Sequence, residues 1–133
     1  MSTHRRGLLD TTVFIAAEAG RRLDEEALPE ESAISVVTVA ELHAGVLTAR
    51  NTATRARRLA TLHAVRDIPA LPVDEAVAVA WSRLRVHLLE VGQRVNVNDT
   101  WIAATAVAHG LTLVTQDDDF APLADAGLTV VRV

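Results

Sequence analysis

The chain lacks several residue types on which whole classes of enzyme depend. It has no cysteine, which excludes disulfides, thiolate nucleophiles and cysteine-ligated zinc or iron–sulfur centres. It also has no lysine, because all 13 basic residues are arginine, and this excludes a Walker-type phosphate lysine, a Schiff base and a kinase lysine. Aromatic residues are limited to two Trp and two Phe, so the core must consist mainly of Ala, Val and Leu.

The sequence also lacks features that direct a chain into a membrane or out of the cell. No apolar run approaches the ~18 residues that a membrane-spanning helix needs. Residues 1–6 are basic, but the apolar stretch 7–9 that follows is too short for the core of a signal peptide. We therefore expect a cytoplasmic protein without membrane contact.

Length and hydropathy limit the organisation of the chain. Its 133 residues suit a single domain over 1–133 and leave no room for a second independent core. The mean hydropathy of +0.22 is high for so small a domain. We therefore expect a partner or a second copy to cover part of the apolar surface.

Charge is distributed unevenly along the chain. The net charge of −4 argues against a protein that coats nucleic acid in general. Residues 50–66 nevertheless hold five arginines and no acid, whereas acids gather at 24–31 and 117–119. The arginines are Arg50, Arg55, Arg57, Arg58 and Arg66.

Short apolar runs alternate with longer helical patterns. We expect strands at 7–9, 33–37, 71–73, 111–115 and 128–133, and helices from Thr11, at 38–49, 52–66, 74–91 and from Asn98 or Asp99 to His109. The longest helix carries an apolar stripe of Val77, Trp81, Leu84, Leu88 and Val91. This alternation, with strands apolar along their whole length, predicts a three-layer α/β/α domain around a mostly parallel sheet.

Four acidic residues lie where such a sheet brings groups together. Asp10 follows the first strand, Glu41 lies one turn into the helix after the second, and Asp117 follows the strand that ends near Thr115. Asp99 begins the helix before that strand. Ligands bind beyond the carboxyl ends of parallel strands, and converging carboxylates repel one another unless a cation lies between them. An all-oxygen ligand set suits Mg²⁺ or Mn²⁺.

Each of these acids also has a purely structural interpretation. Asp10 is suited to cap a helix that starts at Thr11, and the string from Thr38 to Glu41 matches a capping box. Asp99 suits the first turn of a helix, and 117–119 suit a solvated turn. Gly45, four residues after Glu41, either leaves access to its carboxylate or permits close packing of helices.

Four strings in order carry a resemblance to a known family. The strings are LDTTVFI at 9–15, VAELHAGV at 39–46, NDTWIAA at 98–104 and LVTQDDDF at 113–120. With these strings the sequence resembles PIN-domain nucleases, and most closely the VapC-type toxins of bacterial toxin–antitoxin pairs. The resemblance implies one PIN domain over essentially the whole chain, with the activity of an endoribonuclease that needs Mg²⁺ or Mn²⁺.

Motif positions transfer roles to individual residues of this chain. The resemblance implies that Asp10, Glu41, Asp99 and Asp117 form the catalytic acidic quartet. It implies that Asp10, Asp99, Asp117 and Asp119 lie at the metal, with supporting hydroxyls from Thr12 and Thr115. We expect Phe120 to anchor the acidic loop in the core and Asp118 to face solvent.

An RNA substrate would have to reach an acidic pocket. The basic segment at 50–66, and Arg50, Arg55, Arg57 and Arg58 in particular, offers contacts to RNA phosphates, helped by Arg83, Arg85 and Arg94. An ordinary solvated helix face explains the basic segment equally well. With few aromatic residues to stack on bases, we expect recognition through RNA shape and backbone. The five histidines share no motif spacing that would support a metal-free mechanism.

The resemblance also implies partners. A VapB-type antitoxin would inhibit the toxin by wrapping it, with the helices at 12–19, 38–49 and 52–66 offering its groove, and the toxin would form a homodimer. Two alternatives stay open within the fold: an RNA-processing PIN nuclease without a toxin role, and a PIN-like module that binds RNA or protein without cutting. A receiver-type phosphoacceptor domain is disfavoured because it needs a lysine beside its acidic pocket.

Overall fold

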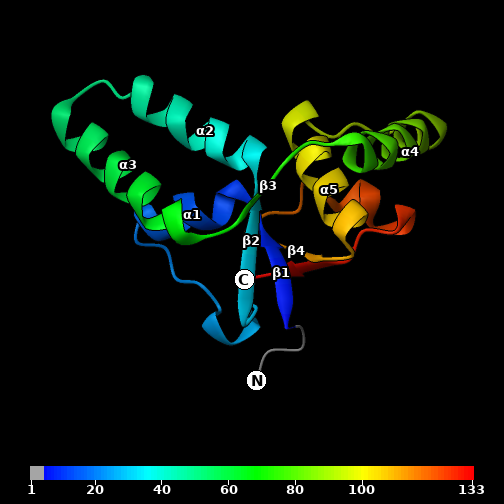
Figure 1. Ribbon diagram of the computed structural model, residues 1–133, viewed down its shortest axis with the longest axis horizontal. Coiled ribbons are helices and arrows are strands. Elements are labelled where there is room, and N and C mark those ends of the chain that lie inside the picture. Colours follow the sequence, from blue (N-terminus) through cyan, green and yellow to red (C-terminus); the bar gives the residue numbers. More distant parts are fainter. Residues whose placement is uncertain (1–4) are drawn as a thin grey trace.

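A computed structural model describes residues 5–133 as a five-stranded sheet covered by helices on both faces (Figure 1). The strand order is β3-β2-β1-β4-β5, and every neighbouring pair is parallel. The prediction of a three-layer α/β/α fold is therefore confirmed. The strands are β1 (Arg6–Leu9), β2 (Glu31–Ser35), β3 (Ala70–Leu71), β4 (Thr112–Thr115) and β5 (Val130–Arg132).

The strand order creates a switch point in the middle of the sheet. From β1 the chain builds outward through β2 to β3, then crosses back to place β4 and β5 on the other side of β1. Parallel sheets bind ligands at such a point, beyond the carboxyl ends of the two central strands. Here these strands are β1 and β4, with Leu9 in register with Val114.

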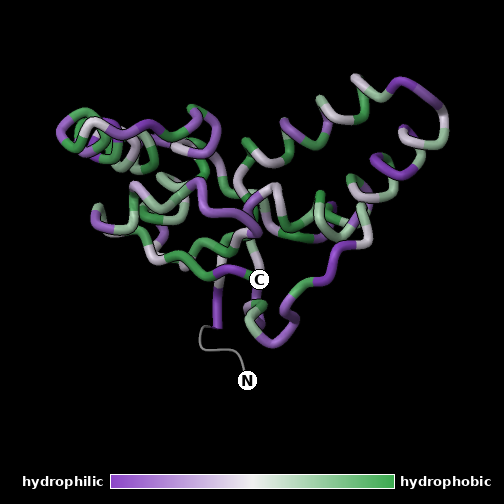
Figure 2. The backbone as a smooth tube through the Cα atoms, turned by 180° about the vertical axis from the view of Figure 1, so that it is seen from behind, coloured by the Kyte–Doolittle hydropathy of each residue, from purple (hydrophilic) through white to green (hydrophobic). Residues whose placement is uncertain are grey.

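Helices form two groups, one on each face of the sheet. The helices α1, α2 and α3 pack on one face, and α4, α5 and the 3₁₀ segment Ala121–Ala126 pack on the other (Figure 1). Figure 2 shows that hydrophilic residues concentrate in the segments that join the helices. The helices are α1 (Thr11–Glu18), α2 (Val36–Leu47), α3 (Thr52–Ala64), α4 (Glu75–Val91) and α5 (Val97–His109).

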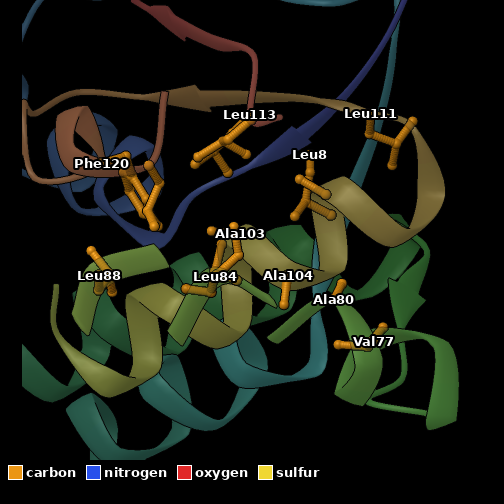
Figure 3. Packing of buried hydrophobic residues seen from close by; sticks show 14 residues of the cluster. Leu8, Val77, Ala80, Leu84, Leu88, Ala103, Ala104, Leu111, Leu113 and Phe120 are labelled. Carbon is orange, nitrogen blue, oxygen red and sulfur yellow. The ribbon is translucent and has the colours of Figure 1, made fainter. Parts of the chain in front are cut away.

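Alternate residues of the central strands supply two separate cores. Leu8 and Leu113 belong to the core shared with α4 and α5, whereas Leu9 and Val114 belong to the core shared with α1 and α2. This is the two-residue period of a strand buried on both faces. Figure 3 shows Leu8 and Leu113 above the first of these cores.

Small side chains let α4 and α5 approach closely. The buried face of α4 consists of Val77, Ala80, Leu84 and Leu88, and it meets Ala103 and its neighbours on α5 (Figure 3). Most of the predicted stripe is confirmed. The prediction was wrong for Val91, the last residue of the stripe, which is 48% exposed where α4 ends at Gly92.

Two helices begin earlier than the sequence indicated. The helix α2 starts at Val36, because Ser35 caps it with its hydroxyl, which accepts from the Val37 N–H at 3.0 Å. Thr38 therefore lies inside the helix, and the capping box proposed for Thr38 and Glu41 is wrong. The valines after Ser35 suggested a longer strand, but the cap decides where the strand ends.

The helix α5 also begins earlier than the sequence indicated. Asn96 caps this helix, accepting from the Asn98 N–H at 2.8 Å, so the helix begins at Val97. Asp99 is thus a first-turn residue and not the residue that opens the helix. Across the described part of the chain, no helix has the length and apolarity to cross a membrane.

Phe120 ties the loop after β4 to the core, as expected. It is 1% exposed and packs with Leu113 and Leu123 in the core beneath α4 and α5. We predict that Phe120→Ala lowers the free energy of unfolding by about 3–5 kcal/mol, because it leaves a cavity at a site with little freedom to collapse. Urea denaturation measures this. Leu47→Ala, at a side chain 81% exposed, is the control and should change stability by no more than about 0.5 kcal/mol. Equal effects of the two substitutions would contradict the prediction.

Candidate active site

Asp10 lies at the switch point of the sheet. It follows β1 directly, its N–H donates to the Val114 carbonyl of β4 at 2.8 Å, and the residue is 1% exposed. It occupies the N-cap position of α1, but its side chain makes no capping hydrogen bond. The structural interpretation of Asp10 as a helix cap is therefore not supported.

Two threonine hydroxyls hold the Asp10 carboxylate. Thr12 Oγ1 donates to Asp10 Oδ2 at 2.6 Å, and Thr115 Oγ1 donates to the same oxygen at 2.9 Å. The other oxygen, Oδ1, is buried and has no hydrogen-bond partner among the described residues. Thr12 and Thr115 thus lie where the sequence placed supporting hydroxyls. One carboxylate oxygen is fixed, and the other is left for a further partner.

The same two hydroxyls also organise the loop after β4. The Gln116 N–H donates to Thr12 Oγ1 at 3.1 Å, and the Asp117 N–H donates to Thr115 Oγ1 at 3.3 Å. Each hydroxyl proton is therefore directed to Asp10, while the lone pairs hold the backbone leading to Asp117. One network sets the positions of both acids.

Glu41 is held by residues that sequence reasoning missed. Thr11 Oγ1 donates to Glu41 Oε1 at 2.7 Å and lies within hydrogen-bond distance, 2.9 Å, of Thr38 Oγ1. Both threonines are buried. The available signal was their position, since Thr11 adjoins Asp10 and Thr38 precedes Glu41 by three residues on one face of α2.

Gly45 lines the same hollow as Glu41. Arg58 crosses this part of α2, and its Nη1 donates to the Gly45 carbonyl at 2.6 Å. A Cβ at Gly45 would lie 3.8 Å from Arg58 Cδ, an ordinary van der Waals distance. Close packing of helices therefore does not require glycine here. Arg58 and Glu41 line one hollow of about 300 Å³, together with Glu18 and Thr11.

Asp99 lies close enough to the other acids for their charges to affect its pKa. Burial raises the pKa of Asp99 to about 7 from an ordinary 3.8, and repulsion by Asp10, Asp117, Glu41 and Asp119 adds to the rise. Burial also raises the pKa of Asp10, with hydrogen bonds from Thr12 and Thr115 opposing it. The structure thus brings all five predicted acids into one electrostatic cluster, from four different segments of the chain.

The loop that carries Asp117 is braced from the C-terminal strand. Arg132 of β5 contacts the exposed Asp118 carboxylate at 2.8 Å through Nη1 and donates to the Gln116 carbonyl at 3.1 Å through Nη2. Asp117 Oδ1 in turn accepts from the Asp119 N–H at 3.0 Å. Asp118 faces solvent, as expected, but it has a partner that the sequence did not reveal.

The donor set of this cluster fits a hard divalent cation. It consists of carboxylates, and the buried Asp10 Oδ1 lacks a partner that a cation would supply. Within residues 5–133, no three acidic or histidine side chains are already gathered as ligands of one ion. The fit therefore rests on donor chemistry and mutual repulsion, which a divalent cation relieves.

The predicted RNA-contacting arginines lie on the α2–α3 side of this cluster. Arg50 and Arg57 are exposed, while Arg55 Nη2 donates to the Ala49 carbonyl at 3.3 Å. Arg58 approaches the acids, as described above. The histidines give no support for a site, since His43 and His63 are exposed and His87 Nε2 contacts the Pro122 carbonyl at 3.1 Å. His4 lies outside the described residues.

Comparison with known proteins places this arrangement in a family. The model of the PIN domain matches residues 7–126. The chain belongs to the PIN-domain family. It is 53% identical to Ribonuclease VapC5 of Mycobacterium tuberculosis over 99% of this chain and 98% of that protein, and 44% identical to Ribonuclease VapC4 of the same organism over 96% and 98%.

A solved structure shows the same fold. The crystal structure of VapBC-5 from M. tuberculosis, a member of the VapBC family of toxin–antitoxin systems, superposes with a TM-score of 0.91. The match has 52% sequence identity and covers 96% of this chain and 98% of that chain. The five-stranded parallel sheet and its flanking helices are thus those of a PIN domain.

We predict that the stability of the metal-free protein depends on pH through Asp99. Because its folded pKa, about 7, lies above the ordinary 3.8, its contribution to stability is complete below about pH 4 and is lost as pH rises through 7. Asp99→Asn cannot ionise, so its melting temperature should exceed that of wild type increasingly between pH 5 and pH 8. Thermal melting in EDTA measures the difference. Added Mg²⁺ at pH 8 should stabilise wild type more than the variant. Parallel melting curves across this range would contradict the repulsion described here.

We predict that Arg132→Ala loosens the acidic loop with little loss of global stability. The two side chains of the ion pair are 58% and 78% exposed, so its contribution is about 0–1 kcal/mol. Hydrogen exchange of a peptide covering 116–119 should nevertheless become faster, because Gln116 loses its clamp. Arg83→Ala, at an exposed arginine of α4, is the control. Unchanged exchange at 116–119 would show that Phe120 and the threonines suffice.

Proposed function

We propose that this protein is a divalent-metal-dependent endoribonuclease that acts as the toxin of a toxin–antitoxin pair. The observation that carries the proposal is the buried Asp10 at the β1–β4 switch point, with one oxygen fixed and one unpaired. It belongs to a cluster in which Asp99 is repelled by Asp10, Glu41, Asp117 and Asp119. Supporting it, the most similar relatives named above are ribonucleases, and VapBC-5 is a toxin–antitoxin system.

The side chains of the cluster divide into ligands and supports. Asp10, Asp99, Asp117 and Asp119 would hold the ion, Mg²⁺ or Mn²⁺, with Glu41 as the further catalytic acid. When bound, the ion supplies Lewis-acid activation of the scissile phosphate and lowers the pKa of a coordinated water. Thr12 and Thr115 keep Asp10 oriented, and Thr11 keeps Glu41 oriented.

The nucleophile in this proposal is water. The chain has no cysteine or lysine, and the hydroxyl protons of Thr12 and Thr115 are already donated to Asp10. In-line attack of water on phosphorus forms one P–O bond and breaks the bond to the 3′-oxygen. The 3′-oxygen takes up a proton, which leaves a 5′-phosphate and a 3′-hydroxyl. The attacking water releases one proton as the new P–O bond forms, so the step consumes no net proton.

The partners of the proposal fit particular surfaces. A VapB-type antitoxin would cover the side formed by α1, α2 and α3, where Ile15 is 47% and Leu47 is 81% exposed. A second copy would cover exposed apolar residues of α4, among them Val79 at 47% and Val86 at 51%, and so form the homodimer. We place the protein, a single domain over 1–133, in the cytoplasm with its RNA substrate.

RNA contacts in this proposal include the α2–α3 arginines. Arg50 and Arg57 are exposed and suited to contact phosphates, whereas Arg55 and Arg58 use part of their guanidinium groups on carbonyls of α2 and of the residues that follow it. A binding module that cannot cut would not need this clustered acid set. The presence and mutual repulsion of all five acids favour cleavage.

The proposal predicts metal-dependent cleavage that disappears when single acids are neutralised. Purified protein freed of antitoxin should cut a structured RNA pool with Mg²⁺ or Mn²⁺ and not with EDTA. Asp10→Asn and Asp99→Asn should each lower the cleavage rate by more than about a hundredfold, because each removes a proposed ligand. Asp125→Asn, at an exposed acid of the 3₁₀ segment, is the matched control and should cut like wild type. Cleavage that persists in EDTA, or near-wild-type rates in either variant, would refute the metal-site assignment.

A further inference from the structure

A second hollow lies on the opposite side of the acidic cluster from α2 and α3. It has a volume of about 560 Å³ and is lined by residues of α4, of the segment that follows it and of the first turn of α5. Figure 1 shows how the chain turns back from α4 into α5. Its lining includes Trp81, Arg85, Gln93 and Arg94. The sequence indicates a supporting part in RNA contacts for Arg85 and Arg94, whereas Trp81 and Gln93 have no assigned function.

The charge of this hollow differs from that of the protein as a whole. The chain carries a net charge of −4, but no acid is among the residues that line this hollow. Arg85 and Arg94 are both exposed, and neither forms an ion pair with any other described residue. The hollow beside Arg58, in contrast, contains Glu18 and Glu41. Two unneutralised guanidinium groups with no competing carboxylate suit the phosphates of a polyanion.

The Trp81 side chain forms part of the lining. Its indole ring stacks on Trp101 with centroids 4.9 Å apart and planes inclined by 19°, which fixes the ring. Its Nε1 is buried and has no partner among the described residues. A buried indole N–H normally finds an acceptor. A rigid, unpaired donor beside two free arginines therefore indicates an oxygen-bearing ligand.

The hollow also reaches the helical turn that carries Asp99. Val97 and Thr100, in the first turn of α5, belong to its lining, and Asp99 lies between them in the same turn. A strand of RNA whose scissile phosphate lies at Asp99 can therefore continue into the hollow over one side of α5. RNA needs such a cationic path, since five acids surround the cleavage point.

We propose that this hollow binds a nucleotide of single-stranded RNA flanking the cleaved bond. Arg85 and Arg94 contact its phosphates, and the Trp81 indole N–H donates to one of its oxygens. The subsite rests on the proposed nuclease function and deepens it, since it gives the RNA a defined path on the α4–α5 side. Because one face of Trp81 is covered by Trp101, the ring acts as a donor and not as a platform between two bases.

The test measures RNA binding without cleavage. The probe is a fluorescent ten-nucleotide unstructured RNA, and anisotropy is recorded in EDTA at several salt concentrations. Arg85→Gln/Arg94→Gln should bind about tenfold more weakly and should lower the salt slope by about 1.4, at about 0.7 per phosphate contact on a single strand. Trp81→Phe keeps an aromatic ring but removes the N–H, and it should weaken binding about threefold or more.

Matched variants control for charge and for folding. Arg21→Gln/Arg22→Gln removes the same charge beyond the far end of α1, at exposed positions. Trp101→Phe alters the other member of the ring pair, which does not line the hollow. Both should bind RNA like wild type. Melting temperatures of all variants establish that they are folded.

The outcomes separate the subsite from the nuclease. Selective loss of binding in the Arg85/Arg94 and Trp81 variants supports the subsite, even if the wild type binds RNA and does not cut it with Mn²⁺, a result that would overturn only the nuclease. Equal binding by wild type and the Arg85/Arg94 variant overturns the subsite. Sedimentation provides a second check: if these substitutions dissociate a dimer and leave RNA binding unchanged, the hollow belongs to an interface between copies. A wild type that binds no RNA overturns both proposals.

Discussion

The two hydrogen bonds that Asp10 accepts on one oxygen are the constraint around which the centre of this molecule is built. The donors, Thr12 and Thr115, come from α1 and β4, so the bonds form only when β1 and β4 are paired and α1 leaves the sheet at the right angle. The same hydroxyls accept from the backbone at Gln116 and Asp117. The position of the acidic loop thus depends on the orientation of one buried carboxylate.

That arrangement is electrostatically unfavourable until a cation binds. Desolvation and like charge both raise the pKa of Asp99 to about 7, and burial raises the pKa of Asp10. The rest of the fold must therefore hold the acids in place against their repulsion, and it does so from outside the cluster. Phe120 anchors the loop in the α4–α5 core, and Arg132 clamps its exposed side. The burial and repulsion of these acids lower the stability of the metal-free protein, and the same acids form a site that suits a divalent ion.

Local patterns were enough to predict the fold class and the edge of the sheet at which Asp10 and Asp117 lie. They were not enough to predict the contacts that position the acids. Strands buried on both faces show as apolar runs, and Asp10 and Asp117 follow such runs directly, so their meeting at one edge could be foreseen. The partnership of Thr11 with Glu41 could not, because it requires α2 to start at Val36, which a single hydroxyl at Ser35 decides. The clamp by Arg132 depends on its register with Thr115, a property of strand pairing that no local pattern contains.

The use of arginine in place of lysine suits the charge requirements of this site. A cluster of acids must admit a polyanion, and the cations beside it must attract phosphates without neutralising the carboxylates. Arginine is suited to this task, because its planar group binds phosphate through two N–H bonds and also reaches backbone carbonyls, as Arg58 does at Gly45 and Arg132 does at Gln116. No acid lines the hollow that holds Arg85 and Arg94. An RNA strand that binds first at this hollow would approach Asp99 along α5. Arg85 and Arg94 would then compensate part of its negative charge before it reaches the acidic cluster.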